Sequence, residues 1–294
     1  MRGILLAGGL GTRLDPITRS INKHLIPVYD KPMIYYPLTT LLLADVSEIC
    51  IVSTRTGVEQ FKNLLGSGSQ WGINLTFAIQ EIPTGIAGGI KLGLDSFQSP
   101  DSTLVILGDN IYHGHGLGRN ISELAKGNRC IIWTQDVDKP ENFGVASFDS
   151  KGRITSITEK PKSASSRTAI TGLYYFPEDV EKLILQTKLS SRGELEITDV
   201  LNSYLIDERI ENVQLSRGVY WLDAGTTSNL VEASQFVQLI QNRQGQLIGS
   251  PDEAAWQLGR ITIEDFVKLK DGLPDSEYKY QLNKSIANRS PYSP

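Results

Sequence analysis

The stretch Gly-Ile-Leu-Leu-Ala-Gly-Gly-Leu-Gly-Thr-Arg-Leu-Asp, residues 3–15, decides the fold of this chain. Its apolar run, residues 4–7, predicts a short buried strand of a parallel sheet. The strand runs directly into a loop with three glycines in four positions, namely Gly8, Gly9 and Gly11. Because glycine has no Cβ, the backbone N–H groups of such a loop can crowd around an anion, so the stretch predicts a phosphate site.

Cations follow this glycine loop. Thr12 and Arg13 come directly after it, and the Arg13 guanidinium offers a rigid fork of donors to phosphate oxygens. Lys23 stands ten residues further on, ahead of the motif Pro-Val-Tyr-Asp-Lys-Pro-Met at residues 27–33. A dinucleotide fingerprint would need Gly-x-Gly-x-x-Gly and an acidic residue at the end of the second strand, where residues 53–55 read Ser-Thr-Arg instead. The combination favours a nucleoside triphosphate over a dehydrogenase cofactor.

The composition is that of an ordinary soluble globular protein of 294 residues, 40 % hydrophobic and 21 % charged, with a formal net charge of −4. This acidic balance gives no support for binding nucleic acid or an anionic membrane, and no window holds the ~18 apolar residues of a membrane helix. We expect no signal peptide, because glycine ends the first apolar run after four residues. Cys50 and Cys130 lie in apolar runs, which is typical of buried structural thiols. A cytoplasmic location is expected.

Strand-like and helix-like segments alternate along the first half of the chain. Strands are predicted at residues 4–7, 49–53, 75–80 and 104–107, and helices at residues 33–45, 58–65 and 85–97. This alternation predicts a Rossmann-like, doubly wound α/β sheet with parallel central strands. Ligands of such sheets bind beyond the carboxyl ends of the strands, where both the glycine loop and Asp109 stand.

The second half is richer in strands. Strands are predicted at residues 130–134, 144–148, 153–158 and 170–176 and near Tyr220, and helices at residues 177–186, 196–206 and 226–242. Turn signals such as Asp-Ser-Lys-Gly at residues 149–152 separate the strands, so we expect antiparallel additions that make the sheet mixed. We predict a catalytic domain over residues 1–242 and a helical C-terminal extension over residues 243–294, with a loose polar tail after Leu282.

Two carboxylates, Asp109 and Asp223, follow predicted strands and stand 114 positions apart. Each could be a helix or turn cap. Two carboxylates together with phosphate oxygens and water would instead make the oxygen-only site that suits Mg²⁺. The pair Glu159-Lys160 adds an acceptor and a cation at the end of another strand, suited to sugar hydroxyls and to a phosphate.

These motifs occur together in one order along nearly the whole chain. They read Leu-Ala-Gly-Gly-Leu-Gly-Thr-Arg-Leu (6–14), Lys23, Pro-Val-Tyr-Asp-Lys-Pro-Met (27–33), Leu-Gly-Asp-Asn-Ile (107–111), Glu-Lys-Pro (159–161), Thr-Gly-Leu-Tyr (171–174), Arg-Gly-Glu-Leu-Glu-Ile-Thr-Asp (192–199) and Trp-Leu-Asp-Ala-Gly-Thr (221–226). The chain thereby resembles the glucose-1-phosphate thymidylyltransferases (dTDP-glucose pyrophosphorylases) of the sugar nucleotidyltransferase family.

The resemblance implies that dTTP and α-D-glucose 1-phosphate give dTDP-glucose and pyrophosphate with Mg²⁺ as cofactor, a step of dTDP-sugar biosynthesis such as the dTDP-rhamnose pathway. The attacking phosphate oxygen is already an anion, so positioning and charge neutralisation carry the catalysis. Arg13 would hold the leaving pyrophosphate, and Lys23 would bridge it and the α-phosphate. Asp109 and Asp223 would hold the metal.

The resemblance also assigns ligands residue by residue. The nucleotide would contact the glycine loop, its cations and a base-reading segment: Leu6, Gly8, Gly9, Gly11, Thr12, Arg13, Lys23, Gln80, Gly85 and Asp109. The sugar phosphate would contact residues further along the chain: Asn110, Gly144, Glu159, Lys160, Ile170, Tyr174 and Trp221. Trp221 could equally fill the core, and the motif at residues 192–199 could serve as a helix start.

A homotetramer with a regulatory nucleotide site between subunits is implied as well. The candidates for that site are His115, Glu253, Trp256 and Arg260. His113 and His115 also invite interpretation as a metal site, but the sequence shows no third nitrogen or sulfur ligand. In a loop they would instead contact a ligand or a neighbouring subunit.

Three positions depart from the pattern of the family. His24 stands where Gln usually follows the lysine, Thr84 replaces an acidic residue of the base loop, and Gly88 replaces its second Gln. Thymidylyl transfer is favoured, but uridylyl transfer or another sugar 1-phosphate stays open, because a thymine methyl is one apolar contact worth ~1 kcal/mol. A non-catalytic regulatory homologue would be expected to lose Arg13, Lys23 or one aspartate, and all are present.

Overall fold

The structure, a computed structural model, describes residues 1–287. The strands of its central sheet are β1 (Arg2–Ala7), β4 (Glu48–Ser53), β5 (Asn74–Ile79), β6 (Thr103–Leu107), β8 (Cys130–Asp136), β9 (Gly144–Phe148), β10 (Ile154–Glu159), β11 (Thr168–Phe176) and β12 (Ile210–Gln214). They are ordered β10-β9-β11-β6-β1-β4-β5, with β8 paired to β11 and β12 paired to β8.

The strands from the first half of the chain pair in parallel, as their alternation with helices predicts. β1 lies between β4 and β6, and Leu5 is in register with Ile51 on one side and Ile106 on the other. β11 joins β6 antiparallel and also pairs antiparallel with β8 and β9. The predicted mixed sheet is therefore confirmed. β12, which runs parallel to β8, is a strand that the sequence analysis does not predict.

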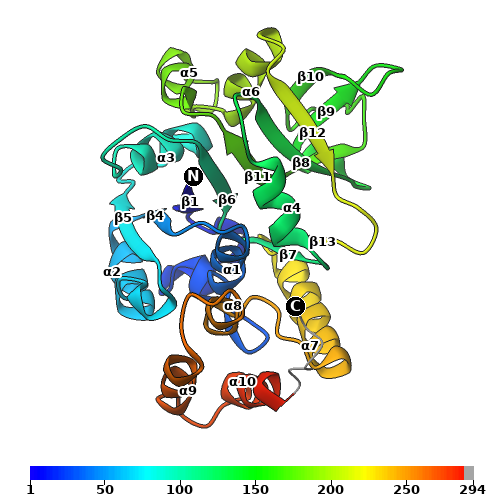
Figure 1. The fold of residues 1–294 in the computed structure, drawn as a ribbon. Helices are drawn as coiled ribbons and strands as arrows, with labels where there is room; N and C mark the ends of the chain where they lie inside the picture. Colours follow the sequence, from blue (N-terminus) through cyan, green and yellow to red (C-terminus); the bar gives the residue numbers. More distant parts are fainter. Residues whose placement is uncertain (288–294) are drawn as a thin grey trace.

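Helices cover both faces of this sheet (Figure 1). They are α1 (Tyr35–Leu43), α2 (Arg55–Leu65), α3 (Gly85–Leu94), α4 (Leu117–Leu124), α5 (Val180–Gln186) and α6 (Ile197–Ile206). Successive strand side chains point to opposite faces, so Ile4 packs in the cluster with α3, α5 and α6, whereas Leu5 packs with α1, α2 and α4. α2 begins three residues before its predicted start because the Thr54 side chain caps it by accepting from Gly57 N.

Two small sheets accompany the central one. β2 (Pro27–Val28) pairs with β3 (Lys31–Pro32), and β7 (Asn110–His113) pairs with β13 (Tyr220–Asp223), both antiparallel. α7 (Thr227–Gln244) follows β13. His113 ends β7 and therefore lies in a strand, whereas His115 lies beyond it. The backbone partners that make residues 110–113 a strand come from a distant part of the chain.

The predicted helical C-terminal segment is present as α8 (Pro251–Gln257), α9 (Ile263–Asp271) and α10 (Glu277–Ala287). Trp256, Phe266 and Tyr278 form the centre of its own small core, and α8 packs against α1 and against η4 (Ser69–Trp71). The predicted loose tail after Leu282 is wrong as far as Ala287, and its remainder, residues 288–294, lies outside the described residues. The domain boundary at residue 242 stays a prediction. It falls inside α7, which ends at Gln244.

Cys50 and Cys130 are fully buried in β4 and β8, as their apolar surroundings predict. Within residues 1–287, no helix combines the length and the apolar character needed to cross a membrane.

Candidate active site

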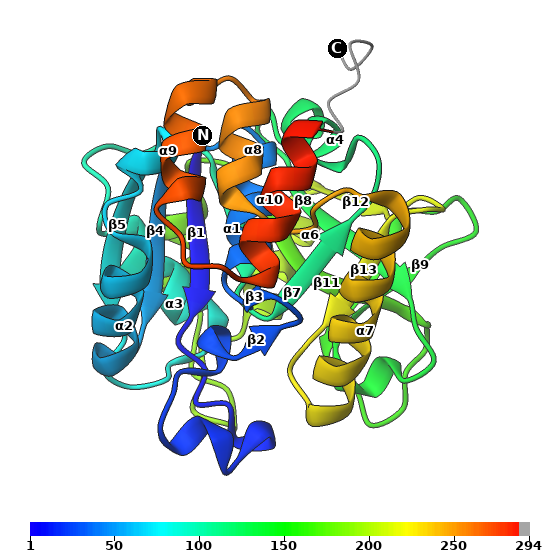
Figure 2. The ribbon, with the colours of Figure 1, turned by 90° about the horizontal axis from the view of Figure 1, so that it is seen from below.

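The glycine loop leads into a segment that lies beyond the carboxyl end of β1 (Figure 2). The amide of Gly108, directly after β6, donates to the Leu6 carbonyl at 2.8 Å and joins the two strand ends. Gly11 adopts φ 65°, which glycine favours, and a Cβ built on it would lie 3.0 Å from Lys23 Cβ. Three short 3₁₀ turns bring Lys23 back over the strand ends: η1 (Thr12–Leu14), η2 (Ile17–Arg19) and η3 (Lys23–Leu25).

The pairing of β7 with β13 brings the two predicted metal ligands together. Asp223 at the end of β13 is in register with Asn110 at the start of β7, next to Asp109. The amide of Ala224 donates to the Asp109 carbonyl at 2.9 Å and extends this pairing. Two carboxylates that are far apart in the sequence thus meet at one edge of the site.

The Asp109 and Asp223 carboxylates and the Arg13 guanidinium converge beside Gly225. A Cβ built on Gly225 would lie 2.8 Å from Asp223 Oδ1, 3.0 Å from Arg13 Nη2 and 3.4 Å from Asp109 Oδ2, so three charged groups surround one point. Burial, and then the charge of Asp109, raise the pKa of Asp223. Among residues 1–287 no three His, Cys, Asp or Glu side chains gather as a metal cluster, so phosphate oxygens and water would have to complete the ligand set of Mg²⁺.

Lys23 and Asp109 form an ion pair at the centre of the site, with 2.5 Å between Nζ and Oδ2. Burial favours a higher pKa for Asp109, but the neighbouring charges and hydrogen bonds, with the charge of Lys23 foremost, together outweigh it and lower this pKa to about 2. Asn110 Nδ2 donates to the other oxygen of Asp109 at 3.0 Å, and Trp221 Nε1 donates to Asn110 Oδ1 at 2.5 Å. This chain of contacts fixes the orientation of the Asp109 carboxylate.

A pocket lies against the glycine loop, and we call it the glycine-loop pocket. Most of the predicted nucleotide ligands line it: Leu6, Gly8, Gly9, Lys23, Gln80, Gly85 and Asp109. Arg13 lines the adjoining pocket, whereas Gly11 and Thr12 line neither of the two. Gly11 contributes the left-handed backbone conformation of the loop.

The adjoining pocket contains Trp221, and we call it the tryptophan pocket. It is lined by every predicted sugar-phosphate ligand, namely Asn110, Gly144, Glu159, Lys160, Ile170, Tyr174 and Trp221, together with Arg13, Asp109 and Asp223. Asp109, Glu159 and Lys160 line both pockets, which places the two side by side. Trp221 both fills the core and lines the pocket, as each of the two expectations had it. It belongs to the main core and meets Phe143 edge-on, with ring centroids 5.2 Å apart.

The pair Glu159-Lys160 sits at a strained turn. Lys160 adopts φ 38°, a left-handed conformation that side chains other than glycine rarely adopt. Its amide donates to the Phe143 carbonyl at 3.0 Å, which holds the turn directly after β10. Burial raises the pKa of Glu159, while Lys160 and Arg192 oppose that shift. Strain of this kind is concentrated at ligand sites, and here it falls on a residue that faces both pockets.

Arg192 is a site residue that the sequence analysis missed. It lines the glycine-loop pocket, with Nη2 2.7 Å from Glu196 Oε2 and 3.6 Å from Glu159 Oε1. The motif at residues 192–199 is noted above as part of the resemblance and as a possible helix start. Its first residues form a loop before α6, and this loop lines the glycine-loop pocket. The contact with Glu159 depends on the fold and has no local signal in the sequence.

His24 is the second missed residue, although its identity was noted as a departure. Its side chain is 1 % exposed, lines the glycine-loop pocket and has Nδ1 2.8 Å from Asn22 Oδ1. Burial, and then the charge of Lys23, lower the pKa of His24 to about 3. The imidazole beside Lys23 is therefore neutral at physiological pH.

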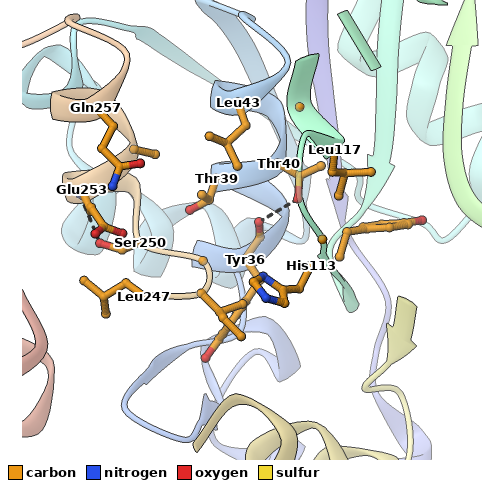
Figure 3. A pocket seen from close by; sticks show the side chains of 16 residues that line it. Tyr36, Thr39, Thr40, Leu43, His113, Leu117, Leu247, Ser250, Glu253 and Gln257 are labelled. Carbon is orange, nitrogen blue, oxygen red and sulfur yellow. Dashed lines mark hydrogen bonds between the residues drawn. The ribbon is translucent and has the colours of Figure 1, made fainter. Parts of the chain in front are cut away.

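A third pocket lies away from this site, between α1, the loop after β7 and the start of α8 (Figure 3). We call it the α1 pocket. Tyr36 and Thr40 line it from α1, His113 from β7 and Glu253 from α8. Burial raises the pKa of Glu253 to about 7, and the charge of Lys31 opposes the shift.

The four regulatory candidates do not gather there. Glu253 lines the α1 pocket, and His115 follows two residues that line it. Trp256 is buried and stacks on Phe266 with ring centroids 4.7 Å apart. Arg260 does not line the α1 pocket, and its Nη2 donates to Asp45 Oδ1 at 2.7 Å.

Comparisons with known proteins agree with this geometry. The family model described as nucleotidyl transferase matches residues 2–239. A glucose-1-phosphate thymidylyltransferase of Xanthomonas campestris pv. campestris is 43 % identical over 289 residues, which cover 98 % of this chain and 97 % of the relative. A protein of the same name from Mycobacterium tuberculosis is 42 % identical over 278 residues, or 95 % and 96 % of the two chains.

Solved structures share the fold. A Bacillus anthracis protein assigned as a glucose-1-phosphate thymidylyltransferase is 38 % identical with a TM-score of 0.74, over 80 % of this chain and 94 % of that one. A UDP-glucose pyrophosphorylase complexed with UDP-glucose is 25 % identical with a TM-score of 0.71, over 82 % and 99 % of the chains. The fold class predicted from the sequence is confirmed.

Proposed function

The chain belongs to the nucleotidyl transferase family, and from that premise we propose that it transfers the thymidylyl group of dTTP to α-D-glucose 1-phosphate. The products are dTDP-glucose and pyrophosphate. The observation that carries the proposal is the junction of the two pockets, where Asp109, Glu159 and Lys160 face both. A nucleotide in the glycine-loop pocket and a sugar phosphate in the tryptophan pocket would meet at that junction.

The reaction needs no general base. An anionic oxygen of the sugar phosphate forms a bond to the α-phosphorus of dTTP, the bond from that phosphorus to the bridging oxygen breaks, and pyrophosphate leaves with the electron pair. The protein therefore has to position the two substrates and neutralise the charge of their phosphates. We assign the leaving pyrophosphate to Arg13, the α-phosphate to Lys23, and the sugar phosphate to Lys160 and Arg192.

We propose Asp109 and Asp223 as ligands of Mg²⁺. Their oxygens are the hard donors that this ion prefers. Burial and then the charge of Asp109 raise the pKa of Asp223, and a cation would relieve the repulsion between the two carboxylates. When bound, Mg²⁺ neutralises phosphate charge during the transfer. Asn110 and Trp221 keep the Asp109 carboxylate oriented for that role.

Uridylyl transfer is the second candidate. The UDP-glucose pyrophosphorylase with a TM-score of 0.71 favours it, because one fold serves both nucleotides. The thymine methyl offers one apolar contact worth ~1 kcal/mol, which is a small basis for discrimination.

Pyrophosphate release tests both candidates. We would supply glucose 1-phosphate and Mg²⁺ with dTTP, UTP, CTP, ATP or GTP, and repeat each reaction with a chelator. The expected result is the fastest release with dTTP, lost on chelation and restored by Mg²⁺. Equal or faster release with UTP would change the nucleotide and keep the mechanism. Release with none of the five would overturn the proposal.

We also propose a homotetramer as the assembly, on the resemblance alone. Gel filtration with light scattering tests it. A species near the chain mass of 32.5 kDa would contradict it and would exclude a regulatory site built between subunits.

A further inference from the structure

Two departures from the family pattern, Thr84 and Gly88, touch one another in the structure. A Cβ built on Gly88 would lie 2.1 Å from Thr84 Oγ1 and 2.9 Å from Thr84 Cβ. These separations are far below any real contact between such atoms. The Thr84 side chain therefore occupies the space that a side chain at position 88 would need, and the two positions form one structural unit.

Thr84 stands at the N-cap of α3 but does not cap it. A threonine at this position ordinarily accepts a hydrogen bond from a backbone N–H of the first turn, and the Thr84 side chain makes no such bond. Its hydroxyl instead accepts from Gln80 Nε2 at 3.2 Å. The backbone is held separately, because the amide of Leu195 donates to the Thr84 carbonyl at 2.8 Å.

Gln80 is confined on its other side by the glycine loop. Its backbone amide donates to the Ser53 carbonyl at 2.7 Å, directly after β5, and its side chain is 8 % exposed. A Cβ built on Gly8 would lie 2.6 Å from Gln80 Oε1, so the amide fits closely between Gly8 and Thr84. It lines the glycine-loop pocket from this position.

We infer that Thr84 is a positioning residue that holds Gln80 for reading a pyrimidine base, and that Gly88 is required because it leaves room for Thr84. The inference rests on the proposed function. An amide presents a donor and an acceptor side by side, which matches a carbonyl beside the N3–H of thymine or uracil. Fixing the amide before the nucleotide arrives removes the loss of side-chain freedom on binding.

Thr84→Val and Thr84→Ser test the hydroxyl. Valine keeps the shape of threonine and removes the hydrogen bond, so the Kd and the KM for dTTP should rise roughly three- to ten-fold, as expected for one neutral hydrogen bond. The KM for glucose 1-phosphate and kcat should stay unchanged, because Thr84 acts on the reaction only by positioning Gln80. Serine retains the hydroxyl and should restore the affinity for dTTP.

Gly88→Ala tests the shared space. Alanine in a helix interior is ordinarily more favourable than glycine, so helix propensity predicts no loss. Here the methyl group should displace the Thr84 hydroxyl and weaken dTTP binding about as much as Thr84→Val does. A Thr84→Gly background removes both the hydroxyl and the Cβ that lie against position 88, so there Gly88→Ala should add no further loss. Additive effects of the two changes would overturn the coupling.

Calorimetric titration with dTTP separates this inference from the proposed function. A wild-type protein that binds dTTP but releases no pyrophosphate would overturn thymidylyl transfer, and the Kd values would still decide the role of Thr84. A Thr84→Val Kd equal to that of the wild type, or a Thr84→Ser Kd equal to that of Thr84→Val, would overturn the positioning role. A wild-type protein that does not bind dTTP would overturn both.

Discussion

Replacing His24 by Gln should reduce the loss of stability on acidification by about 1.4 kcal/mol between pH 7.5 and pH 5.5. His24 is fully enclosed, and burial followed by the charge of Lys23 lowers its pKa from 6.5 to about 3. Asn22 Oδ1 accepts from the backbone amide of His24 at 3.0 Å and lies 2.8 Å from Nδ1. An amide oxygen accepts, so the neutral imidazole donates from Nδ1.

The sign follows from where each state takes up its proton. In the unfolded chain His24 binds a proton as the pH falls through 6.5, whereas in the folded protein it stays neutral to about pH 3. The stability is complete above pH 6.5 and is lost below it, at about 1.36 kcal/mol per pH unit. Between pH 7.5 and pH 5.5 the unfolded pKa lies at the midpoint, and the loss amounts to about 1.4 kcal/mol. Glutamine does not titrate, so His24→Gln removes this loss of stability.

Urea unfolding at pH 7.5, 6.5 and 5.5 measures the effect in both proteins. His113, whose pKa is also lowered by burial, is present in both and cancels in the comparison. His115→Gln is the matched control, since it makes the same replacement at an exposed histidine. Equal pH dependence in wild type and His24→Gln would refute the assignment of a buried neutral imidazole, whatever the difference in absolute stability.

Other residues of the site give further tests. Asp223→Asn should abolish pyrophosphate release while thermal unfolding stays cooperative, because the amide keeps the size of the carboxylate and loses its charge; retained release would sink its assignment to the metal. Lys160→Gly should leave the melting temperature unchanged or raise it, since glycine accepts φ 38° without strain of about 1 kcal/mol, yet raise the KM for glucose 1-phosphate about ten-fold or more. An unchanged KM would remove Lys160 from the sugar-phosphate site. Trp221→Phe should lower the free energy of unfolding by about 1–3 kcal/mol in urea, because it leaves the buried Asn110 Oδ1 without its donor; a neutral result would contradict that contact.

Asp109 and Asp223 show which parts of the site can be predicted from the sequence and which cannot. Each follows an apolar segment, and the rule for parallel sheets places Asp109 at the ligand-binding edge. Their meeting depends on the pairing of Asp223 with Asn110 in register, and residues 110–113 carry no pattern that predicts a strand. A two-stranded ladder between segments so far apart exists only once the surrounding core is formed. The chemistry of the pair was therefore predictable, whereas the β7–β13 ladder that assembles it was not.

Thr84 and Gly88 show a second contact that the sequence predicts only in part. Taken one position at a time, each is simply the replacement of a polar residue of the base-reading segment. They stand four positions apart at the start of α3, so helix geometry places them on the same face. That spacing indicates contact between them, but the direction of the Thr84 hydroxyl toward Gln80 depends on how the loop at residues 192–195 holds the Thr84 backbone.

The charges around the two pockets argue for a cation from outside the chain. The cationic side chains that line them are Arg13, Lys23, Lys160 and Arg192, and the carboxylates are Asp109, Asp223, Glu159, Glu194 and Glu196. Lys23 is paired with Asp109 and Arg192 with Glu196, so these cations are already offset before any phosphate binds. A triphosphate and a sugar phosphate would add further negative charge where the chain supplies no excess of positive charge. A divalent cation, if held by Asp109 and Asp223 as we propose, would reverse that balance at the place where the two anions must approach, which is a reason for Mg²⁺ that is independent of the donor chemistry of the aspartates.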